Sequence, residues 1–319
     1  MNYLLFKRWN DFSGWMVFLI AAFVYGMTIE PTASFWDCPE FISCAEKLQV
    51  GHPPGAPFYM LVGNLFTQFA SDATQVSRMV NFLNALLSAG CILFLFWSIT
   101  RLVRYLLKEE KGELSITDVI IILGSGLVGA LAYTFSDTFW FSAVEGEVYA
   151  FSSFLTALVF WMILRWQDES DSVCGDRWII LIAYIIGLSI GVHLLNLLCI
   201  PAIVLVFYYQ KYQTISLKGV IGAITLSGLL IVLILFVYIP GVADMGGWFE
   251  LLLVNVLGFP FQSGLIIFID FVLLSLLVAI YRFRKRIIHT TLWGMLALTM
   301  ADTTYAVILI RASANTPLN

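Results

Sequence analysis

Charged residues are scarce in this chain, and their scarcity decides its class. Only 12% of the 319 residues are charged, whereas 60% are hydrophobic. A soluble domain has about 25% charged and about 45–50% apolar residues, and a soluble core of this size could not bury so much apolar surface. The mean hydropathy of +0.90 agrees with this. The composition therefore excludes a soluble enzyme, a nucleic-acid-binding domain and a disordered scaffold, and indicates a membrane protein.

Two common site motifs are also missing. The five cysteines are scattered with no Cys-x-x-Cys pair, and they resemble small apolar packing residues. The short polar connectors contain no Gly-rich phosphate loop, so the sequence does not support an ATP or nucleotide-sugar site on the cytoplasmic side.

Long apolar runs fill most of the chain. A membrane-spanning helix needs about 20 apolar residues. The sequence predicts an all-α, polytopic transmembrane helical bundle with spans at 13–30, 80–103, 118–136, 147–165, 178–193, 195–210, 218–240, 264–281 and 287–310.

The basic residues predict the orientation of this bundle. Lys7 and Arg8 precede the first span, which places the N-terminus in the cytoplasm, and nine crossings then place the C-terminus outside. With that topology, all but Lys47, Arg78 and Arg311 of the 17 Lys and Arg residues fall on the cytoplasmic side, as the positive-inside rule requires. No small-x-small cleavage site follows the first span, which we interpret as an uncleaved signal anchor.

The first outer loop, 31–79, carries two acids and a histidine. Ser34 is a candidate helix N-cap, and Asp37 and Glu40 are three residues apart, so a helix places them on one face. Apolar residues on the other side predict an amphipathic helix at the membrane surface. His52, in the Pro-rich turn that follows, titrates near neutral pH. The alternatives are solvated acids at a helix end and a histidine that only shapes a turn.

Further polar residues map to the same side of the predicted topology. Glu145 and Glu147 lie beside aromatic residues at a membrane boundary, and acids next to hydrocarbon are costly and usually functional. The third outer turn holds His193 and Asn196, a pair that can also be purely structural. Asp270 and Asp302 lie inside predicted spans and are candidate functional residues for the same reason.

An outward-facing carboxylate cluster suits two kinds of chemistry. A carboxylate can act as a general base toward an acceptor hydroxyl that attacks a sugar carbon. Asp37 and Glu40 could instead bind a divalent cation through oxygen ligands, which would neutralise a leaving phosphate. Protein cations for that phosphate are few on this side, so Arg78 is a candidate substrate-binding residue, and Lys47 and Arg311 are the others.

Four motifs resemble one known family. They are Trp36-Asp37-Cys38-Pro39-Glu40-Phe41, Gly51-His52-Pro53-Pro54-Gly55-Ala56-Pro57, Val144-Glu145-Gly146-Glu147-Val148-Tyr149-Ala150 and Gly191-Val192-His193-Leu194-Leu195-Asn196. Together they resemble the domain-of-unknown-function 2723 family, which includes a vertebrate endoplasmic-reticulum protein O-mannosyltransferase and looks like a branch of the GT-C membrane glycosyltransferases.

The resemblance implies a donor, a base and a domain organisation. The donor is a polyprenyl-phosphate-linked sugar, Asp37 is the catalytic base with Glu40 as its partner, and Glu145 and Glu147 shape the acceptor or metal site. Residues 1–319 form a single GT-C-like transmembrane domain. The segment 311–319 resembles an internal part of the family, so we expect the chain to be the N-terminal portion of a longer protein.

The leading hypothesis is an inverting glycosyltransferase acting at the extracytoplasmic face on an acceptor hydroxyl, which belongs to a protein, such as that of Ser or Thr, or to a lipid. We expect the inner membrane of a Gram-negative bacterium with the site facing the periplasm, or the endoplasmic-reticulum membrane in a eukaryote. The alternatives are a transporter or flippase that uses Asp270 and Asp302, and a non-catalytic envelope scaffold.

Overall fold

A computed structural model describes residues 2–107, 114–172 and 174–314 of the chain. The described residues form helices joined by turns, with no strand, which confirms the prediction of an all-α membrane protein. Residues 108–113, which lie in a short polar connector, and residues 315–319 of the predicted segment 311–319 lie outside the described residues.

The chain divides into two compact units. The first contains residues 1–164, 191–193 and those from 311 onward, and the second contains 165–190 and 194–310. Each is described separately, and the prediction of a single membrane domain stays a prediction. Helices of the first part of the chain are α1 (Tyr3–Met27), α2 (Cys38–Lys47), α3 (Pro57–Thr67), η1 (Ala73–Gln75), α4 (Val76–Leu106), α5 (Ile116–Thr134), α6 (Asp137–Val144) and α7 (Val148–Glu169). The later ones are α8 (Asp176–Ile190), η2 (Leu194–Cys199), α9 (Ile200–Lys211), α10 (Leu217–Leu233), η3 (Ile234–Tyr238), α11 (Ile239–Glu250), η4 (Leu251–Val256), α12 (Ser263–Arg282), α13 (Arg286–Asp302), η5 (Thr303–Tyr305) and α14 (Ala306–Ala314).

Seven helical runs in the described residues are long and apolar enough to span a membrane, two fewer than the nine predicted. The predicted span at 178–193 corresponds to α8, which has only 15 residues, whereas about 20 are needed to cross the hydrocarbon core. The predicted span at 287–310 falls on α13, η5 and α14, which follow one another without a break from Arg286 to Ala314.

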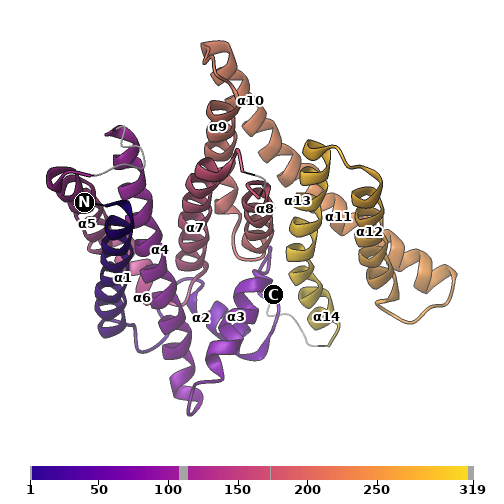
Figure 1. Ribbon diagram of the computed structural model, residues 1–319. Coiled ribbons are helices and arrows are strands. Elements are labelled where there is room, and N and C mark those ends of the chain that lie inside the picture. The colour runs from indigo at the N-terminus through magenta and orange to yellow at the C-terminus, as the bar shows by residue number, and fades with distance from the viewer. Residues whose placement is uncertain (1, 108–113, 173, 315–319) are drawn as a thin grey trace. The chain divides into compact units, whose positions relative to one another are not determined.

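Small residues let the helices of the first unit approach one another closely. Figure 1 shows α1, α4 and α5 side by side, and their shared core contains Ala21, Ala85, Ala89 and Ala130. A Cβ at Gly14 would lie 2.4 Å from Nε1 of Trp97, so only glycine fits at that contact. Close packing of this kind is the main attractive force between helices in a membrane, where apolar surface gains nothing from leaving lipid.

The helix of the seventh predicted span runs further than the sequence indicates. We expected it to end at residue 240, but helical structure continues without a break from Leu217 to Val256. Pro240 lies in this run, directly after the π-helical segment η3. Proline lacks the N–H group that an α-helix needs and clashes with the preceding turn, and a π-helical turn relieves that clash. The helical run therefore ends 16 residues after the predicted end of this span at residue 240.

A partly buried contact between a side chain and the backbone joins α11 to α12 in the second unit. Glu250, at the end of α11, accepts hydrogen bonds from the backbone N–H groups of Gln262, Gly264 and Leu265 at 2.5, 2.8 and 3.2 Å. These groups have no partner within α12 because they belong to its N-terminus, and a carboxylate is the side chain that best complements the positive end of a helix.

Replacing Gly264 with alanine should destabilise the second unit. A Cβ at this position would lie 2.2 Å from Cα of Glu250 and 2.4 Å from its N atom, so the two helices would have to separate and the Glu250 cap would be lost. We expect a loss of about 3 kcal/mol, measured as a lower midpoint of thermal unfolding in detergent. Gly228→Ala is the control, because a Cβ there meets no atom within 4 Å. An equal effect of both variants would contradict the role of the contact.

Candidate active site

The N-terminus of α2 presents Asp37 at the end of an unusual backbone turn. Trp36 has a φ of 62°, in the left-handed region, and its side chain is 90% exposed. Asp37 occupies the N-cap position and is exposed, and α2 begins at Cys38. The expectation that Ser34 caps this helix is therefore wrong, and the amphipathic helix starts three residues later than that cap requires.

Glu40 and His52 form a pair beside Asp37. The Glu40 carboxylate accepts a hydrogen bond from the backbone N–H of His52 at 2.5 Å, and its other oxygen lies 3.1 Å from Nδ1 of His52. One ligand atom from each of Asp37, Glu40 and His52 lies within 4.8 Å of the other two. A Cβ at Gly51 would lie 2.9 Å from Oε1 of Glu40, so glycine lets the turn close over the carboxylate. The structure thus brings together three of the predicted site residues.

The Pro-rich turn after His52 also positions the predicted third outer turn. Gly55 and Ala56 have φ angles of 89° and 39°, and α3 begins at the next residue, which was not predicted. The N–H of Phe58 donates to the carbonyl of Gly191 at 2.7 Å. His193 packs against the ring of Tyr149, with ring centroids 5.5 Å apart, and burial lowers its pKa.

Glu145 and Glu147 lie between α6 and α7 and are buried, not solvated at a boundary. Only 4% and 7% of their surfaces are exposed. Burial raises the pKa of Glu145, and a hydrogen bond from the Ser34 side chain partly offsets that rise. Burial also raises the pKa of Glu147, to about 7, with repulsion from Glu145 and Asp37 adding to the rise. Two carboxyl groups are therefore held beside Asp37 in an environment that favours their protonated forms.

Two asparagines of α4 hold the loops that carry these acids, and sequence reasoning missed both. Asn84 donates from Nδ2 to the carbonyls of Glu145 and Glu147 at 2.5 and 2.6 Å. One turn earlier, Asn81 donates to the carbonyls of Glu30 and Thr32 at 2.6 and 2.9 Å. Both asparagines are fully buried. Polar residues three apart at the start of an apolar span were the signal that could have found them.

Cys38 and Gly146 lie where the two loops meet. The Cys38 thiol is buried, which raises its pKa, and it receives backbone hydrogen bonds from Ser34 and Gly146 that lower it. A Cβ at Gly146 would lie 2.9 Å from Oδ1 of Asn81 and 3.0 Å from Ile42. Helix α2 and the Glu145–Glu147 segment therefore approach each other as closely as their backbones allow.

Replacing Glu147 with glutamine should change how stability depends on pH. Because the pKa of Glu147 rises from 4.5 to about 7 on folding, its stabilising contribution is complete below pH 4.5 and is lost as the pH rises through 7. Each pKa unit corresponds to about 1.4 kcal/mol, so we expect Glu147→Gln to be more stable than wild type above pH 7 by at most about 3 kcal/mol, and equally stable below pH 4.5. Unfolding midpoints across this range test it.

The matched control for this prediction is Glu46→Gln. Glu46 is exposed on α2, so its replacement should leave the pH profile unchanged. Parallel profiles for wild type and Glu147→Gln would contradict the assignment of a raised pKa to Glu147.

The remaining predicted residues are placed differently. Arg78 is exposed on the first turn of α4, and the structure gives no ion pair between it and the acids in the part of the chain that it describes. Arg311 donates to the carbonyls of Leu48 and Lys47 at 2.8 and 2.9 Å, so it caps the C-terminus of α2. Asn196 is buried in η2, which belongs to the second unit, and its role stays a prediction.

Taken together, the site offers an exposed carboxylate supported by a carboxylate–histidine pair and backed by two buried acids. The exposed carboxylate can accept a proton from an incoming hydroxyl, because water and substrate can reach it. The Glu40–His52 pair fixes the neighbouring turn and can contribute ligands to a cation. Such a set of groups is suited to general-base catalysis at the end of a helix.

Comparisons with known proteins show the family of the chain. A family profile described as "Protein O-mannosyl-transferase TMEM260 N-terminal domain" matches residues 37–216, more than half of the chain. "Protein O-mannosyl-transferase tmem260" of Dictyostelium discoideum is 24% identical over 237 residues, and "Protein O-mannosyl-transferase TMEM260" of Mus musculus is 27% identical over 229 residues. Each match covers 70% of this chain and respectively 27% and 29% of the relative.

The chain thus spans less than a third of the length of these curated relatives. No solved structure matches it significantly. The family match begins at Asp37, so it includes the first of the four motifs except for Trp36 and the other three in full. This multi-pass membrane protein therefore belongs to the family of the TMEM260 N-terminal domain of protein O-mannosyl-transferases.

Proposed function

We propose that the protein is a GT-C-type glycosyltransferase that moves a sugar from a polyprenyl-phosphate donor to a hydroxyl of an acceptor protein, with mannose and Ser or Thr as the expected pair. The observation that carries this proposal is the exposed Asp37 carboxylate within 4.8 Å of ligand atoms of Glu40 and His52. The names of the relatives and the four motifs that resemble the domain-of-unknown-function 2723 family support it.

The proposed reaction is a single displacement. The acceptor oxygen attacks the anomeric carbon, a new carbon–oxygen bond forms, and the bond from that carbon to the phosphate oxygen breaks with inversion. Asp37 takes the proton of the acceptor hydroxyl and becomes a carboxylic acid, and polyprenyl phosphate leaves. Glu145 and Glu147, behind Asp37, bind the acceptor or the sugar hydroxyls.

The leaving phosphate needs positive charge, and the site offers little from the protein. Arg311 is already bonded to two carbonyls of α2, and Arg78 makes no ion pair with the acids in the described residues. Two carboxylates and an imidazole suit a divalent cation such as Mn²⁺ or Mg²⁺, so Asp37, Glu40 and His52 fit such an ion. When bound, it would neutralise phosphate charge.

A metal requirement can be measured directly. We expect transfer to fall after chelation and to return with Mn²⁺ or Mg²⁺, and Glu40→Gln to raise the Mn²⁺ concentration for half-maximal rate by about ten- to a hundredfold, because one of three ligands becomes neutral. Glu46→Gln should leave the Mn²⁺ concentration for half-maximal rate unchanged. A rate that is unchanged by chelation would exclude the metal and leave the assignment of Asp37 as the base intact.

The test of the proposed function is an assay of the full-length protein in membranes. Candidate polyprenyl-phosphate sugars and acceptor peptides with a single Ser or Thr are supplied, and product mass and released polyprenyl phosphate are measured. We expect one sugar transferred per lipid phosphate released. Absence of transfer with every donor, in a protein shown to be folded, would contradict the proposal.

We propose that the site faces the periplasm of a Gram-negative bacterium, or the lumen of the endoplasmic reticulum in a eukaryote. This orientation rests on the distribution of Lys and Arg in the sequence. The transport hypothesis is less well supported, because Asp302 lines a pocket whereas Asp270 is exposed and does not line it.

A further inference from the structure

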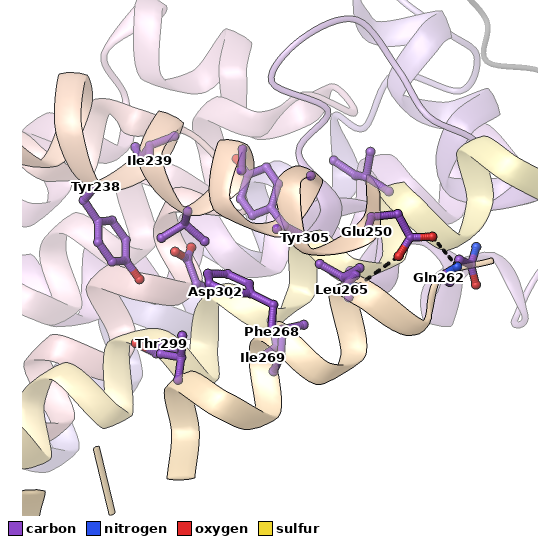
Figure 2. Close-up of a pocket in the computed structure, with 18 of the residues that line it drawn as sticks. Tyr238, Ile239, Glu250, Gln262, Leu265, Phe268, Ile269, Thr299, Asp302 and Tyr305 are labelled. Carbon is purple, nitrogen blue, oxygen red and sulfur yellow. Dashed lines mark hydrogen bonds between the residues drawn. The ribbon is translucent and has the colours of Figure 1, made fainter. Parts of the chain in front are cut away.

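The second unit contains a pocket that the proposed reaction does not use. It has a volume of about 420 Å³ and lies among η3, α11, α12, α13 and α14. Its walls are mostly apolar and include Val242, Ala243 and Gly246 of α11. Leu265 and Phe268 of α12 line it as well (Figure 2). Val242 and Ala243 are also exposed, so the pocket opens to the surroundings of the unit and a ligand can enter it. Its size is that of a small-molecule site.

Asp302 lies in this mostly apolar wall, and one of its carboxylate oxygens lacks a hydrogen-bond partner among the described residues. The Asp302 carboxylate interacts with the hydroxyl of Tyr238, and Figure 2 shows the two side chains next to each other. Oδ1 of Asp302 is buried and has no hydrogen-bond partner among the described residues. An unpaired buried acceptor costs free energy, and such atoms in a native structure call for an explanation such as a missing ligand.

The other polar groups of the lining are already engaged. Glu250 caps α12 through its two oxygens, Thr303 donates to the carbonyl of Met300 at 2.7 Å, and Thr299 bonds with Tyr238. None of the lining residues, all in the described part of the chain, is a Lys, Arg or His. Tyr305 donates to the carbonyl of Ile190 at 3.1 Å, and Gln262 adds a neutral amide. The unpaired carboxylate oxygen of the described lining is thus Oδ1 of Asp302, with no cation in the lining, which matches a ligand with a single hydrogen-bond donor and disfavours an anionic headgroup.

We propose that this pocket binds a neutral lipid that carries a hydroxyl group, with the apolar chain between α11 and α12 and the hydroxyl donating to Oδ1 of Asp302. A primary ammonium group is attracted by the carboxylate, but it has three donors, and donors left unpaired in the apolar wall cost more free energy than this attraction returns. A phosphate or carboxylate headgroup would face Asp302 with no positive charge to balance it. The site is distinct from the acids of the first unit and does not depend on the proposed transfer reaction.

The test uses photoreactive, alkyne-tagged lipids of equal chain length that differ only in the polar end. A long-chain primary alcohol, the matched carboxylic acid and the matched amine are added to the purified 319-residue chain in detergent, and labelled peptides are quantified by mass spectrometry. We expect the alcohol to label peptides of α11 to α13 about five- to tenfold more than the acid, since one buried hydrogen bond is worth about 1 kcal/mol and the acid adds repulsion.

Four variants locate the binding site. Asp302→Leu should remove the preference for the alcohol, whereas Asp302→Asn, which keeps an oxygen acceptor, should retain it. A Cβ at Gly246 would lie 3.5 and 3.6 Å from Leu265 and Phe268, so Gly246→Val fits locally, fills the pocket and should lower labelling by every probe. Gly241→Val is its control, because Gly241 lies on the same helix, does not line the pocket, and has nothing within 4 Å of its Cβ.

Several results would overturn the proposal. They are equal labelling by alcohol and acid, stronger labelling by the amine, and labelling by the alcohol that survives Gly246→Val. If Asp302→Leu fails to fold, the preference of the wild-type chain for the alcohol and the effect of Gly246→Val against Gly241→Val still decide the question.

Discussion

We expect Asp37→Asn to slow the proposed sugar transfer by about 10²- to 10⁴-fold and to leave the protein folded. Asparagine has nearly the same shape but cannot take the proton of the acceptor hydroxyl, and general-base catalysis contributes about 10²- to 10⁴-fold to a rate. Because Asp37 is exposed and forms the N-cap without a side-chain hydrogen bond to the helix, we expect little change in the unfolding midpoint. The measurement is the initial rate of transfer by the full-length protein at saturating donor and acceptor.

Two further measurements distinguish a catalytic role of Asp37 from a structural one. Glu46→Gln removes an exposed acid from the same helix and should transfer sugar at the wild-type rate. Asp37→Asn should also lower the pKa of Glu147, because repulsion from Asp37 is one of the causes that raise it. A wild-type rate in Asp37→Asn would show that another group is the base, whereas loss of transfer together with unfolding would point to a structural role.

Asn84→Leu should cause the largest loss of stability in the first unit. Leucine is apolar and similar in size, but it leaves the carbonyls of Glu145 and Glu147 without the donor that Asn84 supplies. Each unpaired buried group costs about 1–3 kcal/mol, so the expected loss is about 2–6 kcal/mol. Thermal unfolding in detergent measures it. Transfer by the variant, assayed at a temperature where it remains folded, should also fall because both acids change position.

Asn64→Leu is a closely matched control. Asn64 also donates to two backbone carbonyls, those of Ala45 and Glu46, at 2.9 and 3.1 Å. These bonds lie at a partly exposed site where water can replace the lost donor, so its loss should be below about 1 kcal/mol. Similar losses of stability in both variants would contradict the conclusion that burial of the loop between α6 and α7 makes the Asn84 hydrogen bonds worth more than those of Asn64.

The fold class and the proximity of Asp37 and Glu40 could be predicted from the sequence because both depend on local patterns. Apolar runs give helices in a membrane, and the spacing of Asp37 and Glu40 gives one helix face. The burial of Glu145 and Glu147 could not be predicted in this way, because it depends on Asn84 and Ser34, which are distant in the sequence. The length of a helix was also hard to predict where a proline was accommodated by a π-helical turn, as at Pro240.

The Glu250 cap also affects where the end of a helix can lie in a bilayer. A helix N-terminus exposes N–H groups that hydrocarbon cannot satisfy, so it normally has to reach water or a lipid headgroup. Glu250 accepts hydrogen bonds from three such groups at the start of α12. These hydrogen bonds also offset the free-energy cost of removing the Glu250 carboxylate from water. This end of α12 therefore does not need hydration, and α11 and α12 can enter the membrane together as one hairpin.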